Sequence, residues 1–295
     1  MAHKRLQITF SWDDRHATSI GMQRAVLIMF IAMSLIPAGD SAGKIMTSQL
    51  GVAPVFVAWS RFAFGTLLLL PFVPPNTLQL FGNWRIWLRA AMLCGGITSI
   101  QVALQTEEVA NVFAAFFIGP LLSYTLAAIF LRERITLARS GLILAGFAGV
   151  LLVVRPGYGV SIGLLWALAA GTFYGIFLTM SRWLSHLAPP LSLSFSQLLI
   201  SGFLLLPLGL SNLPDLTGPI ASLTLVSAAC SMVGNLLMLY TYRLVPATKV
   251  APLIYFQLLS AVTLGWLLFG ALPDLLTWAG LSVILVAGIA STRLR

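Results

Sequence analysis

The stretch 109–131, VANVFAAFFIGPLLSYTLAAIFL, runs for 23 residues without a charged side chain. Three further uncharged runs cover residues 156–181, 216–242 and 250–273. An α-helix rises about 1.5 Å per residue, so about 20 apolar residues cross the hydrocarbon core of a bilayer, which is roughly 30 Å thick. The runs lack the alternating pattern that is typical of barrel strands. They therefore predict membrane-spanning α-helices.

The composition of the whole chain supports the same interpretation. Of its 295 residues, 59% are hydrophobic and only 8% are charged, and its mean hydropathy is +0.96. A soluble domain carries about a quarter of its residues as charged side chains, so this chain has too few to cover a water-exposed surface. The fold class predicted here is therefore an all-α integral membrane protein.

Turn and breaker residues divide the apolar sequence into ten predicted spans. These are residues 24–44, 52–72, 86–105, 109–131, 137–154, 160–182, 191–210, 217–242, 249–270 and 274–292. The preceding segment, 1–22, contains Asp13 and Asp14 and is too polar for a cleavable signal peptide. We expect it to be a cytosolic tail.

The distribution of basic residues predicts the orientation. With ten spans and a cytosolic N-terminus, fourteen Lys and Arg fall on the cytosolic side, whereas only Lys44 and Arg155 fall on the other. This asymmetry follows the positive-inside rule. It places both termini in the cytosol and predicts a multi-pass protein of the cell inner membrane. The net charge of +9 is then a topology signal, which removes the main argument for nucleic-acid binding.

The two halves of the chain, 23–155 and 156–295, resemble each other at an offset of about 136–139 residues. Pro54 matches Pro190, Cys94 matches Cys230, and Gly141 matches Gly280. Because each half has an odd number of predicted spans, the second would cross the membrane upside down relative to the first. Inverted repeats are typical of transporters that alternate between inward-open and outward-open states around a central site.

Several motifs resemble one known family. The segment ending in Pro120, the run Leu131-Arg-Glu133, the run Gly141-Leu-Ile-Leu-Ala-Gly and the stretch Ala251-Pro-Leu-Ile-Tyr-Phe-Gln are similar to EamA-type members of the drug/metabolite transporter superfamily. The resemblance covers residues 23–292. It implies ten helices in two inverted repeats, a cavity lined mainly by spans 1, 3, 4, 6, 8 and 9, and movement of a small organic solute, commonly outward. Ala271 stands where the second repeat would carry an acid.

Polar and aromatic residues within the spans are candidates for substrate binding. They form stripes at helical spacing in spans three, six and eight, or stand singly in spans four and nine. We expect a neutral wall that suits an amino acid or related metabolite. Hydrogen bonding between helices is the alternative use of such residues. The candidates are Gln101, Gln105, Asn111, Trp166, Tyr174, Asn235, Tyr240 and Tyr255.

Arg61 lies near the middle of the second span, where an unpaired charge costs about 3 kcal/mol or more. It could be a counter-ion for an anionic substrate group, but a structural arginine bonded to carbonyl groups is favoured, because span two is not expected to line the cavity. Asp40 could couple transport to protons. A solvated pair with Lys44, four residues further on, is the favoured interpretation of Asp40.

Two other classes of function were considered. A membrane transferase would need a nucleophile, a base or a metal-binding cluster, and His186 stands alone in the spans. A non-transporting helical scaffold would gain nothing from inverted halves. We therefore expect a transporter with a small-molecule substrate, embedded in lipid, with no catalytic residues, metal site or cofactor.

Overall fold

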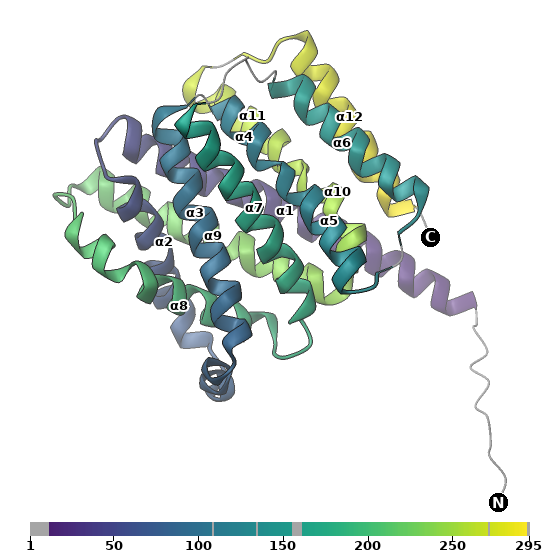
Figure 1. Cartoon of the computed structure of the whole chain (residues 1–295), viewed down its shortest axis with the longest axis horizontal. Coiled ribbons are helices and arrows are strands. Elements are labelled where there is room, and N and C mark those ends of the chain that lie inside the picture. The colour runs from purple at the N-terminus through teal and green to yellow at the C-terminus, as the bar shows by residue number, and fades with distance from the viewer. Residues whose placement is uncertain (1–11, 108, 134, 155–160, 271, 294–295) are drawn as a thin grey trace, which may run out of the picture.

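The computed structural model describes residues 12–107, 109–133, 135–154, 161–270 and 272–293 (Figure 1). Over these ranges the chain forms twelve α-helices and two short 3₁₀ helices, and no strand. The α-helices are α1 (Trp12–Ser48), α2 (Pro54–Leu69), α3 (Trp84–Thr106), α4 (Val109–Phe116), α5 (Ile118–Phe130), α6 (Leu137–Val154), α7 (Ile162–Trp183), α8 (Pro190–Ser211), α9 (Gly218–Leu244), α10 (Ala247–Ile254), α11 (Phe256–Phe269) and α12 (Leu275–Arg293). The 3₁₀ helices are η1 (Leu70–Phe72) and η2 (Pro75–Gly82).

The all-helical membrane fold is confirmed. Among the described residues, seven segments are long and apolar enough to span a bilayer, and three shorter apolar helices cover 118–130, 137–153 and 275–290. The bundle exposes many large apolar side chains, which suits a surface that faces lipid. The total of ten spans remains a prediction.

Two predicted spans are broken helices. The span predicted at 109–131 divides into α4 and α5 at Phe117, and the span predicted at 249–270 divides into α10 and α11 at Tyr255. Each break lies within one turn of a proline, Pro120 or Pro252, which lacks the N–H that a continuous helix needs. The breaks are 138 residues apart, within the offset that relates the two halves. Their rings are in edge contact, with centroids 5.7 Å apart.

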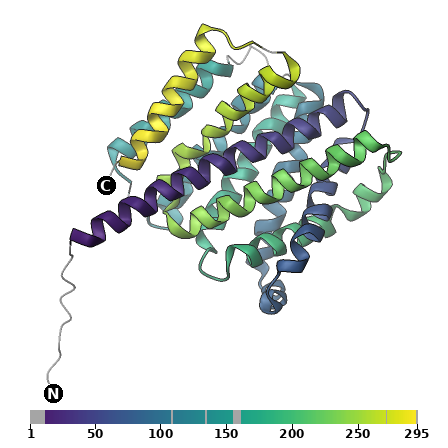
Figure 2. The same cartoon turned by 180° about the vertical axis from the view of Figure 1, so that it is seen from behind.

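The largest packing interfaces join one half of the chain to the other. Helix α1 packs mainly on α9, α3 on α7, α2 on α8, and α6 on α12. Figure 2 shows α1 and α9 side by side along most of their length. Exchanging the halves, so that α1 takes the place of α7 and α3 that of α9, leaves this set of pairs unchanged. The halves are therefore interleaved, and a space at the centre is bounded by both.

Small residues allow the close approach of α7 to α4 and α5. A Cβ atom added at Gly171 would lie 2.6 Å from the carbonyl oxygen of Phe116, and one added at Gly175 would lie 2.7 Å from that of Gly119. Real Cβ atoms do not approach oxygen so closely, so only glycine fits at these two positions. The predicted use of the glycine ladder in this helix as a close-packing surface is confirmed.

Candidate functional site

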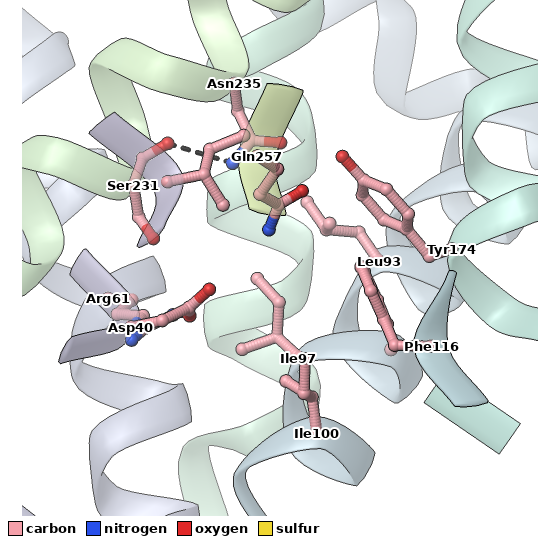
Figure 3. Close-up of a pocket in the computed structure, with 12 residues that line it drawn as sticks. Asp40, Arg61, Leu93, Ile97, Ile100, Phe116, Tyr174, Ser231, Asn235 and Gln257 are labelled. Atoms are coloured by element: carbon pink, nitrogen blue, oxygen red, sulfur yellow. Dashed lines mark hydrogen bonds and ion pairs between the residues drawn. The ribbon is translucent and has the colours of Figure 1, made fainter. Parts of the chain in front are cut away.

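A small cavity lies at the centre of the bundle (Figure 3). Its volume is about 30 Å³, which is room for about two water molecules. The cavity is therefore occluded in this conformation. Helices from both halves line it, and the lining residues are Ile36, Asp40, Arg61, Leu93, Gly96, Ile97, Ile100, Phe116, Tyr174, Ser231, Asn235 and Gln257. The six spans that the family resemblance implied all contribute, and α2 adds Arg61.

An ion pair between Asp40 of α1 and Arg61 of α2 forms one wall. The Arg61 Nη1 donates to the Asp40 Oδ1 at 2.6 Å, its Nη2 to the Gly39 carbonyl at 2.6 Å, and its Nε to the Ser227 hydroxyl at 2.8 Å. Ser227 also donates to the Gly39 carbonyl, at 2.8 Å. Gly39 permits this arrangement because a Cβ there would lie 3.0 Å from the Ser227 carbonyl oxygen.

The favoured interpretation of Asp40 from the sequence was wrong. Asp40 is only 7% exposed and pairs with Arg61 rather than standing in solvent at a helix end. Arg61 bonds to a carbonyl, as its favoured interpretation held, but it also borders the cavity, from a helix that was not expected to do so. Opposite charges in two adjacent predicted spans were the signal for this pair, because an intramembrane charge nearly always finds a partner.

Amide and aromatic side chains form the rest of the polar wall. The Asn235 Nδ2 donates to the Ser231 carbonyl at 2.9 Å, which fixes the amide orientation and leaves Oδ1 without a partner among the described residues. The Oε1 of Gln257 likewise has no partner there. Tyr174 lies against Phe116, with ring centroids 4.9 Å apart. These groups offer hydrogen bonds and π faces to an occupant.

Of the predicted site residues, Tyr174 and Asn235 line the cavity. Gln101 is buried beside Arg61, where both side chains border the space over Gly43, and neither polar atom of its amide has a partner among the described residues. Tyr255 is buried at the helix break, against Gly146, and does not line the cavity.

The other predicted residues lie elsewhere. The structure does not bring Gln105, Trp166 or Tyr240 to the cavity, and all three are exposed on the outside of the bundle. The side chain of Asn111 lies outside the described residues. Gln257, two residues after Tyr255 and on the other side of its helix, faces the cavity instead. Sequence spacing allowed only one of these two to do so, and did not indicate which.

A second fully buried arginine, Arg89 of α3, lies outside the cavity. It donates to the Ser181 hydroxyl, the Leu193 carbonyl and the Gln197 side chain, and stands 5.2 Å from the centre of the Phe177 ring. At the repeat offset, Gln197 corresponds to Arg61 and Arg89 corresponds to Ser227. The two halves therefore each bury one guanidinium at an equivalent interface, supplied from opposite helices.

Glu133 joins the halves at the end of the bundle that is predicted to be cytosolic. Its carboxylate accepts from the backbone N–H groups of Ala247 and Thr248, at 3.1 and 2.9 Å, at the start of α10. It also accepts from the Arg182 Nε at 3.2 Å. Arg132, at φ 53°, ends α5 with a left-handed residue just before it. The sequence suggested a solvated turn here, and the structure shows a helix cap.

Replacing Glu133 with glutamine is expected to lower the free energy of unfolding by about 1–2 kcal/mol. The variant keeps the shape of the side chain but loses the charge that stabilises the N-terminus of α10 and pairs with Arg182. Thermal unfolding of the detergent-purified protein measures this. Asp215→Asn, in the exposed connection between α8 and α9, is the matched control and should leave the unfolding temperature unchanged. An unchanged temperature for Glu133→Gln would contradict the capping role.

Metal ligands were considered for the same residues. Within the described ranges, no group of three His, Cys, Asp or Glu side chains lies close enough together to hold a metal ion. The site thus offers hydrogen bonds, one ion pair and aromatic faces.

Comparison with known proteins places this fold and cavity among transporters. A riboflavin transporter of Brucella anthropi is 26% identical over 278 residues, covering 90% of this chain and 97% of that protein. An S-adenosylmethionine uptake transporter of Rickettsia bellii is 26% identical, covering 88% and 91%. A pseudopaline exporter of Pseudomonas aeruginosa is 27% identical, covering 92% and 97%.

Structure and family comparisons agree with these relatives. A solved crystal structure matches 92% of this chain and 97% of its own, with a TM-score of 0.73 at 19% identity, which supports the fold. The model of the EamA-like transporter family matches the chain twice, over residues 23–155 and 161–293. The protein is thus a multi-pass membrane protein with a two-repeat architecture, and it belongs to the EamA-like transporter family of the drug/metabolite transporter superfamily.

Proposed function

We propose that this protein carries a small organic solute across the inner membrane by alternating access, with the central cavity as its binding site. Ten spans in two inverted five-helix repeats, 23–155 and 156–295, would supply the two halves. One observation carries the proposal: buried polar atoms without partners, on Asn235 and Gln257, face a space that both halves enclose. Such atoms are costly to bury unless an occupant bonds them for part of the cycle.

The occluded cavity is too small for a metabolite, so the transport cycle requires the halves to separate. The symmetric set of packed pairs supports two related arrangements, one open to each side. The contacts of Glu133 with Arg182 and α10 cross between the halves, so they would hold one end closed. Both termini would lie in the cytosol, as the distribution of Lys and Arg suggests.

The chemistry of the cavity wall favours a polar, heteroatom-rich solute with an apolar part, such as an amino acid or related metabolite. Amide groups can bond its polar atoms, and Phe116 and Tyr174 can lie against its apolar part. The relatives carry solutes of this general kind, since riboflavin and S-adenosylmethionine both combine a planar heterocycle with polar groups. These relatives include uptake proteins and an exporter. Export, which the family resemblance favours, is part of the proposal.

Asn235→Ala is expected to reduce saturable transport about tenfold, because it removes the fixed acceptor of the cavity wall. A metabolite screen of cells with and without the chain identifies solutes, and counterflow of labelled hits into proteoliposomes measures the flux. Asn212→Ala, at the exposed end of α8, is the control and should transport normally. Normal counterflow by Asn235→Ala would remove the cavity from the transport path.

Counterflow also separates transport from the two alternatives. A membrane transferase or a non-transporting scaffold would show no saturable exchange of any solute. The relatives named above are all transporters, which favours the transport function.

A further inference from the structure

We infer that the cavity recognises a protonated amine, with the carboxylate of Asp40 as its docking group. This inference rests on the proposed transport function and specifies the class of its substrate. It follows from which atoms of the cavity wall are satisfied by the protein and which are left free.

The two charges of the cavity wall are not equally accessible. Arg61 is only 2% exposed, and its guanidinium is engaged by Asp40, Gly39 and Ser227 together. Asp40 uses Oδ1 for this pair, and its other oxygen has no bond to any described residue. Figure 3 shows the Asp40 carboxylate reaching toward the middle of the cavity, between Ile97 and Gln257, with Arg61 behind it. An occupant therefore meets the negative end of the pair first.

The neighbouring polar atoms add to this preference. The Asn235 amide is held by the Ser231 carbonyl with its nitrogen outward from the cavity, so its free atom is the acceptor Oδ1. Gln257 is free to present its oxygen as well, because that atom has no partner among the described residues. An ammonium group, with up to three donors and no acceptor, matches a carboxylate and two amide oxygens.

Aromatic side chains face the same space. Phe116 and Tyr174 present rings whose π faces attract a cation as well as an apolar group. Among the described residues that line the cavity, Asp40 and Arg61 are the charged ones, so no other cation competes for the carboxylate. A carboxylate on the solute would meet Asp40 rather than Arg61 and would be repelled. The wall thus favours an aryl or alkyl amine, or the amino end of a larger solute.

The test uses three matched probes on the detergent-purified full-length chain: 2-phenylethylamine, 2-phenylethanol and 3-phenylpropionate. Dissociation constants come from the concentration dependence of the unfolding temperature at pH 7. The amine is expected to bind about tenfold more tightly than the alcohol, and the carboxylate least tightly. Equal binding of amine and alcohol, or tightest binding of the carboxylate, would overturn the inference.

Asp40→Asn is expected to abolish the preference for the amine while binding of the alcohol persists. Asp215→Asn, an exposed acid away from the cavity, should keep the preference. If Asp40→Asn does not fold, because it leaves Arg61 without its anion, Asp40→Asn/Arg61→Gln removes both charges and serves in its place. A preference that survives loss of Asp40 would also overturn the inference.

These results are separable from those of the proposed function. Counterflow of a neutral or acidic metabolite, lost in Asn235→Ala, together with no amine preference, would leave transport through the cavity intact and reject only the amine. A tenfold amine preference that depends on Asp40, in a protein without any counterflow, would support the binding site and reject the transport function.

Discussion

Replacing Arg61 with methionine is expected to destabilise the protein by about 3–5 kcal/mol and to leave little folded chain in the membrane. The variant keeps much of the length of the side chain but removes the cation, so the buried carboxylate of Asp40 loses its partner. Breaking a buried ion pair by removing one member has an effect of this size, because the remaining charge is uncompensated. The Gly39 carbonyl and the Ser227 hydroxyl also lose their donor.

Thermal unfolding and the yield of monodisperse protein after detergent extraction measure this effect. The double variant Asp40→Asn/Arg61→Met should recover most of the lost stability, because neither charge is then left alone. Recovery by the double variant would assign the loss to the stranded carboxylate. A single variant as stable as the wild type would show that the carboxylate does not depend on Arg61, contrary to the structure.

Gly175→Leu is expected to lower the free energy of unfolding by about 3 kcal/mol or more. Its Cβ would lie 2.7 Å from the carbonyl oxygen of Gly119 and 3.0 Å from the Cβ of Leu122. The first obstacle is a backbone atom, which cannot move aside unless α5 shifts away from α7, and overpacking of that kind is among the costlier core changes. The contact between the halves next to the cavity would be lost together with the stability.

Gly141→Leu provides the matched control. No atom lies within 4 Å of a Cβ added at Gly141, which is exposed on α6, and a leucine there suits a surface that faces lipid. We expect its unfolding temperature to equal that of the wild type. Equal losses in both glycine variants would show that leucine disturbs these helices through their own conformation rather than through the contact of α7 with α5.

Much of the fold could be predicted because its signals are local. Uncharged runs of suitable length identify the helices, and the arrangement of Lys and Arg suggests their orientation. The breaks at Phe117 and Tyr255 were missed, since Pro120 and Pro252 lie in runs that are otherwise uniformly apolar. Prolines are common in membrane helices, and which of them divides a helix depends on the neighbouring helices.

The candidate site was less predictable because it depends on contacts between distant segments. Tyr174 and Asn235 could be selected from their helical stripes, but Gln105 and Tyr240, chosen for the same chemical reason, lie on the outside. A polar stripe shows that one helix face avoids lipid and does not identify what that face contacts. The pairing of Asp40 with Arg61 needs α1, α2 and α9 in their final positions.

The ring contact of Phe117 with Tyr255 has a mechanical consequence. A point where two equivalent hinges touch is the natural fulcrum of a see-saw, because it needs to turn but not to travel. Straightening one hinge would press its ring on the other, so a gap opening toward one compartment would be geared to shrinkage toward the opposite one. Such gearing guards the bilayer against leaks, since simultaneous opening to both compartments would require the two rings to part.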